Sequence, residues 1–480
     1  LVLPWLTAYT AGPLSNAWPW LVSAFCAALV WLFWRRLDAR LIATAWVLAA
    51  AVSAVIALVQ YFGLAQVFNP WISQTGAGEA FANLRQRNQF ATLTSIGLLA
   101  LVALLARRAP GLRVPGWMYA AMALLALGNA ASSSRTGLLQ WLLIVALTAG
   151  WALRGQRRTA LFALQALLAY GLAVFALPWL LSAATGLSSA GLLGRLAETP
   201  GCGSRRVLWS NVLTLMAQKP WLGWGWGELD YAHFMTLYPG PRFCEILDNA
   251  HNLPLQLAVE LGIPAALALC ACAGWWVWRG KPWREADPAR QLAWGVLAVI
   301  LLHSLLEYPL WYGPFQLAFG LCVGLLWTRA ASSRTAAPEF KENKPVAQYI
   351  RVLLAAISIA FLAFAGYDYS RVSQLYLPAE ARSPALREDT MNKVGGSWLF
   401  ADEVRFAALS VTVLAPGNAE SVHTLALQLL HYSPEARVAE KLIASARMLG
   451  LDEEALLYQA RYRAAFPEAH ARWARETTGH

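Results

Sequence analysis

Residues 41–62 read LIATAWVLAAAVSAVIALVQYF, an apolar run without a single charged side chain. A helix of about 20 such residues crosses the roughly 30 Å hydrocarbon core of a bilayer, because each residue adds about 1.5 Å along the axis. Similar runs lie on both sides, and 58% of the 480 residues are hydrophobic while only 14% are charged. This composition excludes an ordinary soluble domain and predicts an all-α, polytopic membrane protein.

The chain contains about ten apolar segments of suitable length. They are residues 18–34, 41–62, 89–106, 117–131, 137–153, 159–183, 253–278, 291–306, 314–328 and 351–370. The opening stretch, Leu1 to Tyr9, is apolar and lacks an initiator Met, so we expect it to be the remainder of a truncated first span. The predicted fold is therefore a transmembrane helical bundle of about eleven spans.

Lys and Arg residues concentrate in alternate loops, and this alternation predicts the orientation of the bundle, because cytoplasmic loops retain positive charge. The basic loops hold Arg35, Arg36 and Arg40; Arg107, Arg108 and Arg113; Arg154, Arg157 and Arg158; Arg279, Lys281, Arg284 and Arg290; and Arg329, Arg334, Lys341 and Lys344. We attribute the net charge of +11 to these residues rather than to nucleic-acid binding. On this topology the loop from about 184 to 252 and the chain after about 370 face away from the cytoplasm.

This topology divides the chain into four expected domains. They are N-terminal transmembrane helices over 1–183, a long periplasmic loop with surface helices over 184–252, C-terminal transmembrane helices over 253–370, and a periplasmic helical domain over 371–480.

The last of these domains mixes acidic and basic residues evenly and lacks long apolar runs. Apolar stripes predict helices over 419–432, 435–449 and 452–465. The ending at Phe466-Pro467 resembles a tetratricopeptide unit, a fold that usually binds proteins. A plain structural cap is the alternative.

Two cysteines, Cys202 and Cys244, fall in the long outer loop. In an oxidising compartment they either form a disulfide across the loop or remain free. Neither has the neighbours of a metal site, and we expect neither a metal nor a cofactor.

The first sizeable outer loop carries two arginines among three amides, in the order Arg85, Gln86, Arg87, Asn88 and Gln89. Arginines are uncommon in outer loops because basic residues concentrate in cytoplasmic loops, so a specific role is expected for these two. Guanidinium groups bind phosphate oxygens through paired hydrogen bonds. Arg85 and Arg87 are therefore candidates for an anion site; contact with lipid headgroups or an ion pair within the loop are the alternatives.

A third outer arginine, Arg135, follows the serines of the turn Ser132–Ser134. The hydroxyl groups can cap the next helix. The start of a helix supplies free amides and positive potential, so Arg135 at this position predicts an anion site.

The long loop contains apolar spacing over 204–218 that predicts an amphipathic helix lying on the membrane surface. Its first arginines, Arg205 and Arg206, would then lie near lipid headgroups. Further along, tryptophans alternate with glycines and form either an interfacial belt or faces that stack on sugars and prenyl chains. They are Trp221, Trp224 and Trp226.

His251 lies where the long loop enters the apolar segment 253–278, with Asp248 just upstream. An imidazole can take a proton from an alcohol near neutral pH, although a lone His is more often structural. On another outer turn, an acid stands beside two tyrosines: Glu307, Tyr308 and Tyr312. An acid at a membrane edge needs a partner, which predicts a polar crater among apolar helices.

Six segments together resemble the O-antigen ligase superfamily, and most closely its bacterial protein O-oligosaccharyltransferase branch, the pilin-glycosylating (PglL-type) enzymes. The segments are Arg85–Gln89, Ser134–Gly137, Arg206–Trp209, Pro220–Gly225, Asn249–Asn252 and Glu307–Pro309. This resemblance implies transfer of a glycan from an undecaprenyl-diphosphate carrier to a Ser or Thr of a pilin-like or other periplasmic protein.

In such a reaction His251 is the expected general base, and Asp248 or Glu307 would orient it. Cationic side chains would stabilise the diphosphate that leaves. The candidates are Arg135, Arg206, Arg205, Arg85 and Arg87. The expected glycan-binding or acceptor-binding residues are Asn88, Gln89, Asn252, Trp224, Tyr308 and Tyr312.

Three other functions fit parts of the sequence. A ligase that loads glycan onto lipid A core, or a polymerase that extends O-antigen, would use similar parts with a glycolipid acceptor. A transporter of lipid-linked sugar predicts ionisable residues at the membrane midplane and repeated halves. The polar groups within the spans are few, such as Gln60, Gln140 and Gln165. A non-catalytic scaffold would leave the Arg and His residues unexplained.

Overall fold

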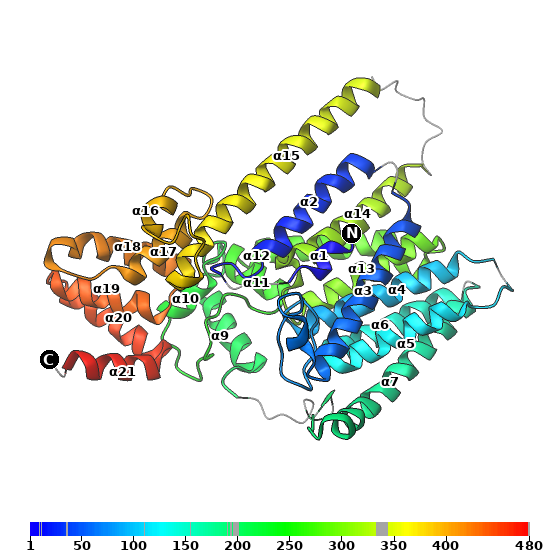
Figure 1. Cartoon of the computed structure of the whole chain (residues 1–480), viewed down its shortest axis with the longest axis horizontal. Helices are drawn as coiled ribbons and strands as arrows, with labels where there is room; N and C mark the ends of the chain where they lie inside the picture. Colours follow the sequence, from blue (N-terminus) through cyan, green and yellow to red (C-terminus); the bar gives the residue numbers. More distant parts are fainter. Residues whose placement is uncertain are drawn as a thin grey trace. The chain divides into compact units, whose positions relative to one another are not determined.

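A computed structural model describes residues 1–8, 10, 12–34, 37–109, 111–153, 155–189, 191–192, 194, 201–332 and 344–478. Every regular element in these ranges is a helix, which confirms the predicted all-α class (Figure 1). Five residues of the basic loops lie outside the described residues: Arg35, Arg36, Arg154, Arg334 and Lys341.

The chain divides into two compact units, each made from two separate stretches. The bundle unit comprises Leu1–Glu198 and Trp276–Gly366. The loop-tail unit comprises Thr199–Trp275 and Tyr367–His480, so the long loop and the C-terminal segment belong to one compact body.

The bundle unit consists mainly of long apolar helices. They are α2 (Ala17–Phe33), α3 (Ala39–Tyr61), α4 (Arg87–Ala106), α5 (Gly116–Ser132), α6 (Arg135–Ala152), α7 (Arg157–Thr185), α13 (Pro288–Ser304), α14 (Gly313–Ser332) and most of α15 (Lys344–Val372). Short elements connect them: α1 (Leu3–Leu6), η2 (Ala65–Phe68), η3 (Pro282–Arg284) and η4 (Pro309–Trp311).

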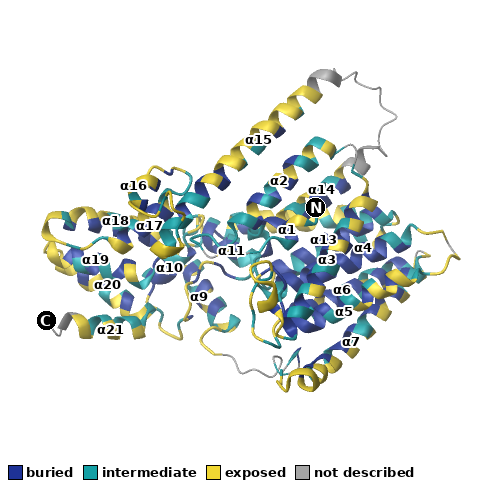
Figure 2. Cartoon of the chain, in the orientation of Figure 1, coloured by how far each residue is buried: buried dark blue, intermediate teal, exposed yellow. Residues whose placement is uncertain are grey.

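Helix α4 forms the centre of this bundle, in contact with α3, α5, α6, α7 and α13. Its apolar side chains face all directions, so a stable fold must cover it on every side. Figure 2 shows α4 largely buried and α15 largely exposed; 89% of the apolar window of α4 is buried, against 17% of that of α15. The exposed side chains of α15 are themselves apolar, as expected of a surface that faces lipid.

Nine of the ten predicted apolar segments coincide with single helices, within a few residues. By length and composition, four helices in the described ranges are suited to cross a membrane, namely 39–61, 87–106, 157–185 and 348–376, and two shorter apolar helices are 17–33 and 313–327. The total of about eleven spans stays a prediction.

The prediction of one continuous helix over 253–278 is wrong. The helix is interrupted at Gly262, which separates α11 (Leu253–Leu261) from α12 (Ile263–Gly280). Gly262 has φ +90°, and a Cβ atom there would lie 2.0 Å from the Trp221 carbonyl oxygen. The segment 220–225 passes so close because it hydrogen-bonds to the end of α11, with Trp224 N 2.9 Å from Val259 O. Glycine permits both the close approach and the left-handed backbone.

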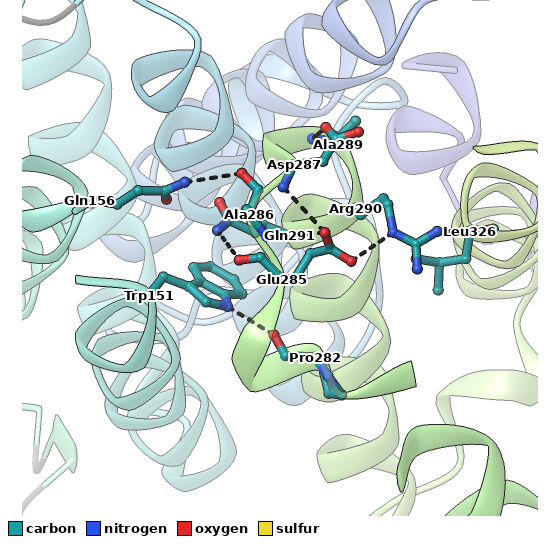
Figure 3. A network of polar contacts seen from close by, with 10 residues as sticks. All are labelled: Trp151, Gln156, Pro282, Glu285, Ala286, Asp287, Ala289, Arg290, Gln291 and Leu326. Carbon is teal, nitrogen blue, oxygen red and sulfur yellow. Dashed lines mark hydrogen bonds and ion pairs between the residues drawn. The ribbon is translucent and has the colours of Figure 1, made fainter. Parts of the chain in front are cut away.

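A polar network around Glu285 connects helices at the end of the bundle that carries the basic loops (Figure 3). Arg290 Nε donates to Glu285 Oε2 at 2.6 Å, and Arg290 Nη1 donates to the Leu326 carbonyl of α14 at 2.9 Å. Trp151 Nε1 of α6 donates to the Pro282 carbonyl at 3.0 Å. These bonds satisfy the polar groups of the loop before α13 and join three helices at one end.

The loop-tail unit is also helical. Its elements are α9 (Arg205–Gln218), α10 (Leu229–Met235), α11, most of α12, η5 (Ser373–Tyr376), η6 (Ala379–Ala381), α16 (Thr390–Val394), α17 (Ala401–Val411), η7 (Pro416–Asn418), α18 (Ala419–Tyr432), α19 (Ala436–Met448), α20 (Asp452–Ala465) and α21 (Pro467–Thr478). The three predicted tail helices are confirmed as α18, α19 and α20. Their likeness to tetratricopeptide units stays a prediction.

Helix α10 of the long loop packs against α18 and α20 of the tail. Phe234 of α10 is buried in the same apolar core as Phe406, Leu430 and Leu442. Arg461 Nε also donates to the Met235 carbonyl at 3.1 Å. The tail therefore shares its core with the loop.

Candidate functional site

Predicted site residues occur in both units, and each group is described within its own unit. In the bundle unit, Asn88 lies in the first turn of α4 and bonds to two distant residues. Ser134 Oγ donates to Asn88 Oδ1 at 2.6 Å, and Asn88 Nδ2 donates to Glu307 Oε1 at 3.3 Å. These partners are 46 and 219 residues away along the chain. We call Asn88, Ser134 and Glu307 the rim cluster; it joins three of the segments that carried the resemblance.

Two further amides and two tyrosines extend the rim cluster. Gln89 Nε2 donates to Gln86 Oε1 at 3.0 Å, and Gln86 Nε2 donates to the Tyr308 hydroxyl at 3.4 Å. The rings of Tyr308 and Tyr312 stack with centroids 5.7 Å apart. Gln89 is buried while both tyrosines are half-buried, so the tyrosines keep surface for a ligand.

A second polar layer lies beneath the rim cluster, and sequence reasoning did not place it in the site. Thr92 Oγ1 and His303 Nδ1 are 2.9 Å apart, and Gln140 Nε2 donates to Thr92 Oγ1 at 2.8 Å. Ser95 Oγ donates to Gln140 Oε1 at 3.1 Å. All four side chains are buried, and the His303 backbone carbonyl accepts the Glu307 N–H at 2.8 Å. The one available signal was the lone amide of Gln140 within an apolar span.

Arg135 is the first residue of α6, directly after the Ser134 cap, whose Oγ accepts the Gly137 N–H at 3.0 Å. The predicted serine cap is thus confirmed. The Arg135 side chain is exposed and makes no hydrogen bond or ion pair with any residue that the structure describes. A free guanidinium at a helix N-terminus is an anion-binding arrangement.

The two arginines of the first outer loop differ from each other. Arg87 pairs with Glu79, the loop ion pair that was one alternative for this segment. Arg85 is exposed, has φ +60° and forms no ion pair within the described ranges. Arg85 therefore retains a charge for an anion, whereas that of Arg87 is offset.

In the loop-tail unit, the segment around His251 is held from both sides. Ala250 N donates to Gln256 Oε1 at 2.6 Å, and Trp209 Nε1 donates to the Ala250 carbonyl at 3.1 Å. Asn252 caps α11 by accepting the Leu255 N–H at 3.1 Å.

His251 itself has φ +49°, an unfavourable conformation for a residue with a side chain. Its N–H donates to Asn249 Oδ1 at 2.8 Å, and the amide of Asn249 is buried. Neighbouring bonds thus fix a strained backbone at His251, and such strain clusters at functional sites.

Acidic groups accompany His251 in this unit. Asp248 keeps contact with solvent, yet the surrounding protein limits its hydration and raises the pKa of its carboxyl, while the charge of His251 lowers it. Burial, together with the charges of Asp248 and Glu228, raises the pKa of Asp230 to about 7. Asp230 was not predicted as a site residue, because its burial depends on the packing of α10.

Arg205 and Arg206 begin α9, after the cap residue Ser204. The predicted helix is confirmed, but its apolar face does not lie on a membrane surface. Leu208, Val212 and Leu215 are fully buried against the protein. Arg205 is half-buried and Arg206 is exposed.

Trp224, expected to bind glycan or acceptor, is half-buried and makes two contacts within this unit. Its Nε1 donates to the Leu215 carbonyl at 3.0 Å, and Lys219 Nζ lies 4.0 Å from its ring centroid. Trp221 and Trp226 are largely exposed. Cys202 and Cys244 form a disulfide, with Cα atoms 5.6 Å apart, so the pairing left open by the sequence is present.

Three family models match the chain. "Protein glycosylation ligase" matches residues 80–105, "O-Antigen ligase" matches 120–270, and "Virulence factor membrane-bound polymerase, C-terminal" matches 291–478. The first covers Asn88, the second covers Arg135 and His251, and the third covers Glu307 and the tail.

Two curated relatives come from Acinetobacter baylyi. A general O-oligosaccharyltransferase is 24% identical over 334 residues, or 68% of this chain and 56% of that protein. A ComP-specific O-oligosaccharyltransferase is 23% identical over 347 residues, 70% of this chain and 59% of that protein. The chain thus spans less than two thirds of these relatives. No solved structure matches it.

The matches and the apolar helices together identify a membrane protein. They also confirm the resemblance stated from the motifs. The chain is therefore similar to the protein glycosylation ligases and O-antigen ligases that the family models describe, and to the two O-oligosaccharyltransferases.

Proposed function

We propose that this protein is a membrane glycosyltransferase that moves an oligosaccharide from an undecaprenyl-diphosphate carrier to a Ser or Thr of a periplasmic or pilin-like protein. One observation carries the proposal: Asn88 hydrogen-bonds to both Ser134 and Glu307, so three segments typical of this superfamily form one polar cluster. The two relatives, both O-oligosaccharyltransferases by name, support the same reaction class.

The reaction joins the acceptor hydroxyl oxygen to the anomeric carbon of the first sugar. The bond from that carbon to the diphosphate oxygen breaks, and undecaprenyl diphosphate leaves with the electron pair. The hydroxyl proton passes to the His251 imidazole, which then releases it to water. Asp248 supports this role because its negative charge interacts favourably with protonated His251.

The leaving diphosphate needs positive charge, and arginines supply it without a metal ion. Arg135 is the strongest candidate, since its guanidinium is exposed at the start of α6. Arg85 and the α9 arginines, Arg205 and Arg206, are assigned the same role. Arg87 contributes less because Glu79 offsets its charge.

In this proposal Glu307 is a positioning residue rather than a proton acceptor, and Asn88 holds its carboxylate in place. The amide of Asn88 fixes the carboxylate, and the bond from Ser134 fixes the amide. Tyr308, Tyr312, Gln89 and Asn252 are assigned to glycan or acceptor binding.

The finer topology belongs to the same proposal. About eleven helices cross the bacterial inner membrane, and the loop-tail unit faces the periplasm, where the tetratricopeptide-like tail meets the acceptor protein. The basic network around Glu285 would then lie on the cytoplasmic side.

A second candidate is ligation or polymerisation of O-antigen with a glycolipid acceptor. The matches to the "O-Antigen ligase" and polymerase models favour it, since they cover more of the chain than the glycosylation-ligase model. The two candidates share the donor chemistry and differ in the acceptor.

Reconstitution separates them. Purified protein is mixed with lipid-linked oligosaccharide and either a pilin-like protein or lipid A core. Glycosylated protein is the expected product. Modification of the glycolipid alone would replace the proposal with the second candidate, and no transfer to either acceptor would contradict both.

A further inference from the structure

A pocket of about 340 Å³ lies at the end of the bundle opposite the rim cluster, among α3, α4 and α5. Helix α4 starts at Arg87 beside the rim cluster and ends at Ala106, and its 20 residues extend about 30 Å. The pocket lies beyond that second end. Its lining is formed by Arg40, Thr44, Val47, Leu104, Arg107, Arg108, Trp117 and Met118.

Three guanidinium groups make this pocket positive. Arg40 and Arg108 are exposed, and Arg107 is mostly covered, with 17% of its side chain exposed. Asp38 offsets only part of this charge: it lies 3.6 Å from Arg107 Nη1 and accepts the Arg40 backbone N–H. Neither the Arg40 nor the Arg108 side chain forms an ion pair with a described residue.

Two helices begin at this end of the bundle, α3 at Ala39 and α5 at Gly116. Asp38 caps the start of α3, and the negative end of α4 lies nearby, so the start of α5 is the uncompensated positive helix end beside the pocket. The first turn of α5 has no side-chain cap, which leaves its amides for another acceptor.

The remaining walls of the pocket are apolar. Val47 and Leu104 form one side, while Trp117 and Met118 come from the first turn of α5. Trp117 is 53% exposed, and the neighbouring face of α3 presents exposed Leu41 and Leu48. An inorganic anion would use the arginines and leave these walls in contact with water. A ligand with an anionic head and hydrocarbon chains fits both parts.

We propose that this pocket binds the phosphate headgroup of an anionic glycerophospholipid, such as phosphatidylglycerol. Arg40 and Arg108 contact the phosphate, and the acyl chains follow the apolar walls toward the exposed face of α3. Basic pockets between transmembrane helices on the cytoplasmic side recognise such headgroups. This inference does not depend on the reaction catalysed at the rim cluster.

Charge retention during insertion also places arginines at this end of the bundle, and it requires no binding. The two explanations differ in whether the exact positions of the arginines matter. Retention needs only the number of charges, so Arg113 in the same loop would serve as well as Arg108. Specific binding needs the arginines that line the pocket, and Arg113 does not line it.

The test uses the full chain in detergent with added phosphatidylglycerol, phosphatidylcholine or inorganic phosphate. Native mass spectrometry counts bound lipid, and thermal unfolding gives an apparent affinity. The variants are Arg40→Gln/Arg108→Gln and, as matched control, Arg113→Gln. Arg107 is left intact because it is largely covered and paired with Asp38.

The expected result is that phosphatidylglycerol binds to and stabilises the wild type and Arg113→Gln, and that the double variant binds it about tenfold more weakly. Phosphatidylcholine and inorganic phosphate should give little stabilisation. Equal weakening by Arg113→Gln, equal binding of phosphatidylcholine, or full stabilisation by inorganic phosphate would each overturn the proposal.

Discussion

Asn88 Nδ2 donates a hydrogen bond to Glu307 Oε1 at 3.3 Å, although the two residues are 219 positions apart in the chain. The amide oxygen of Asn88, Oδ1, accepts a hydrogen bond from Ser134 Oγ at 2.6 Å. Asn88 thereby uses both its donor and its acceptor inside the bundle unit. A neutral amide that bridges a hydroxyl and a carboxylate can fix the carboxylate without changing its charge.

Asn88→Ala should lower glycan transfer by about tenfold or more and cost about 1–3 kcal/mol of stability, because Ser134 and Glu307 both lose a partner. Transfer is measured with saturating donor, and stability by thermal unfolding in detergent. Thr94→Ala is the matched control, since this buried Thr of the same helix bonds only to the Ala91 carbonyl. Unchanged transfer by Asn88→Ala would remove the rim cluster from the site.

Arg135→Gln should raise the donor KM about tenfold, because one charged hydrogen bond to the diphosphate is lost. The side chain is exposed and unpaired within the described residues, so stability should hardly change. Arg206→Gln should act in the same direction, whereas Arg87→Gln should have a smaller effect because Glu79 offsets its charge. A larger effect on acceptor KM than on donor KM would contradict the diphosphate assignment.

His251→Asn should lower transfer by about 10²–10⁴-fold while the fold persists. Asn tolerates a positive φ better than most residues, so the strained backbone of this position is kept while the base is removed. His431→Asn, in the exposed part of α18, is the control. Circular dichroism checks the fold of both variants, and wild-type transfer by His251→Asn would make the base assignment wrong.

The helices of this protein could be predicted from the sequence because long apolar runs decide them locally. The three tail helices follow their apolar stripes for the same reason, and α18 and α20 have the predicted ends. The break at Gly262 could not be predicted, because it depends on a segment about 40 residues upstream that approaches the end of α11.

Candidate site residues could be proposed singly, but their partners could not. Asn88 and Glu307 are conspicuous as polar residues beside apolar runs, whereas their hydrogen bond is a tertiary contact. The high pKa of Asp230 likewise arises from burial and nearby acids, which the sequence around α10 does not reveal. An ion pair within the first outer loop was one predicted alternative for Arg87, but its partner Glu79 could not be named from the sequence.

Asp230 should make the stability of the loop-tail unit depend on pH. Its carboxyl keeps its proton in the folded protein up to about pH 7, but loses it near its ordinary value of 3.8 when unfolded. The folded state therefore binds more protons between these values, and the free energy of unfolding should fall as pH rises from about 4 to about 7.

Asp230→Asn should remove this decline and give a protein more stable than the wild type at pH 8, by about 1 kcal/mol or more. Thermal unfolding at pH 5 and pH 8 measures the difference. Asp402→Asn is the control, because Asp402 is exposed and its pairing with Arg405 lies on the surface. A wild-type decline that persists in Asp230→Asn would assign it to another group.

Gly262→Ala should destabilise the protein by about 3 kcal/mol, because a methyl group there meets both an unfavourable φ and the Trp221 carbonyl oxygen. The alanine would push away the segment 220–225, whose amides bond to the carbonyls at the end of α11. Thermal unfolding and limited proteolysis of the long loop measure the loss.

Gly274→Ala provides the matched control for this prediction. Gly274 lies inside α12, and a Cβ atom there meets nothing within 4 Å. Alanine at that position should stabilise the helix by about 0.5–1 kcal/mol, since glycine is a poor helix former. If Gly262→Ala lowers the free energy of unfolding and Gly274→Ala, 12 residues away, raises it, the cost arises from the contact at Gly262. Equal effects of the two changes would contradict the close approach of Trp221.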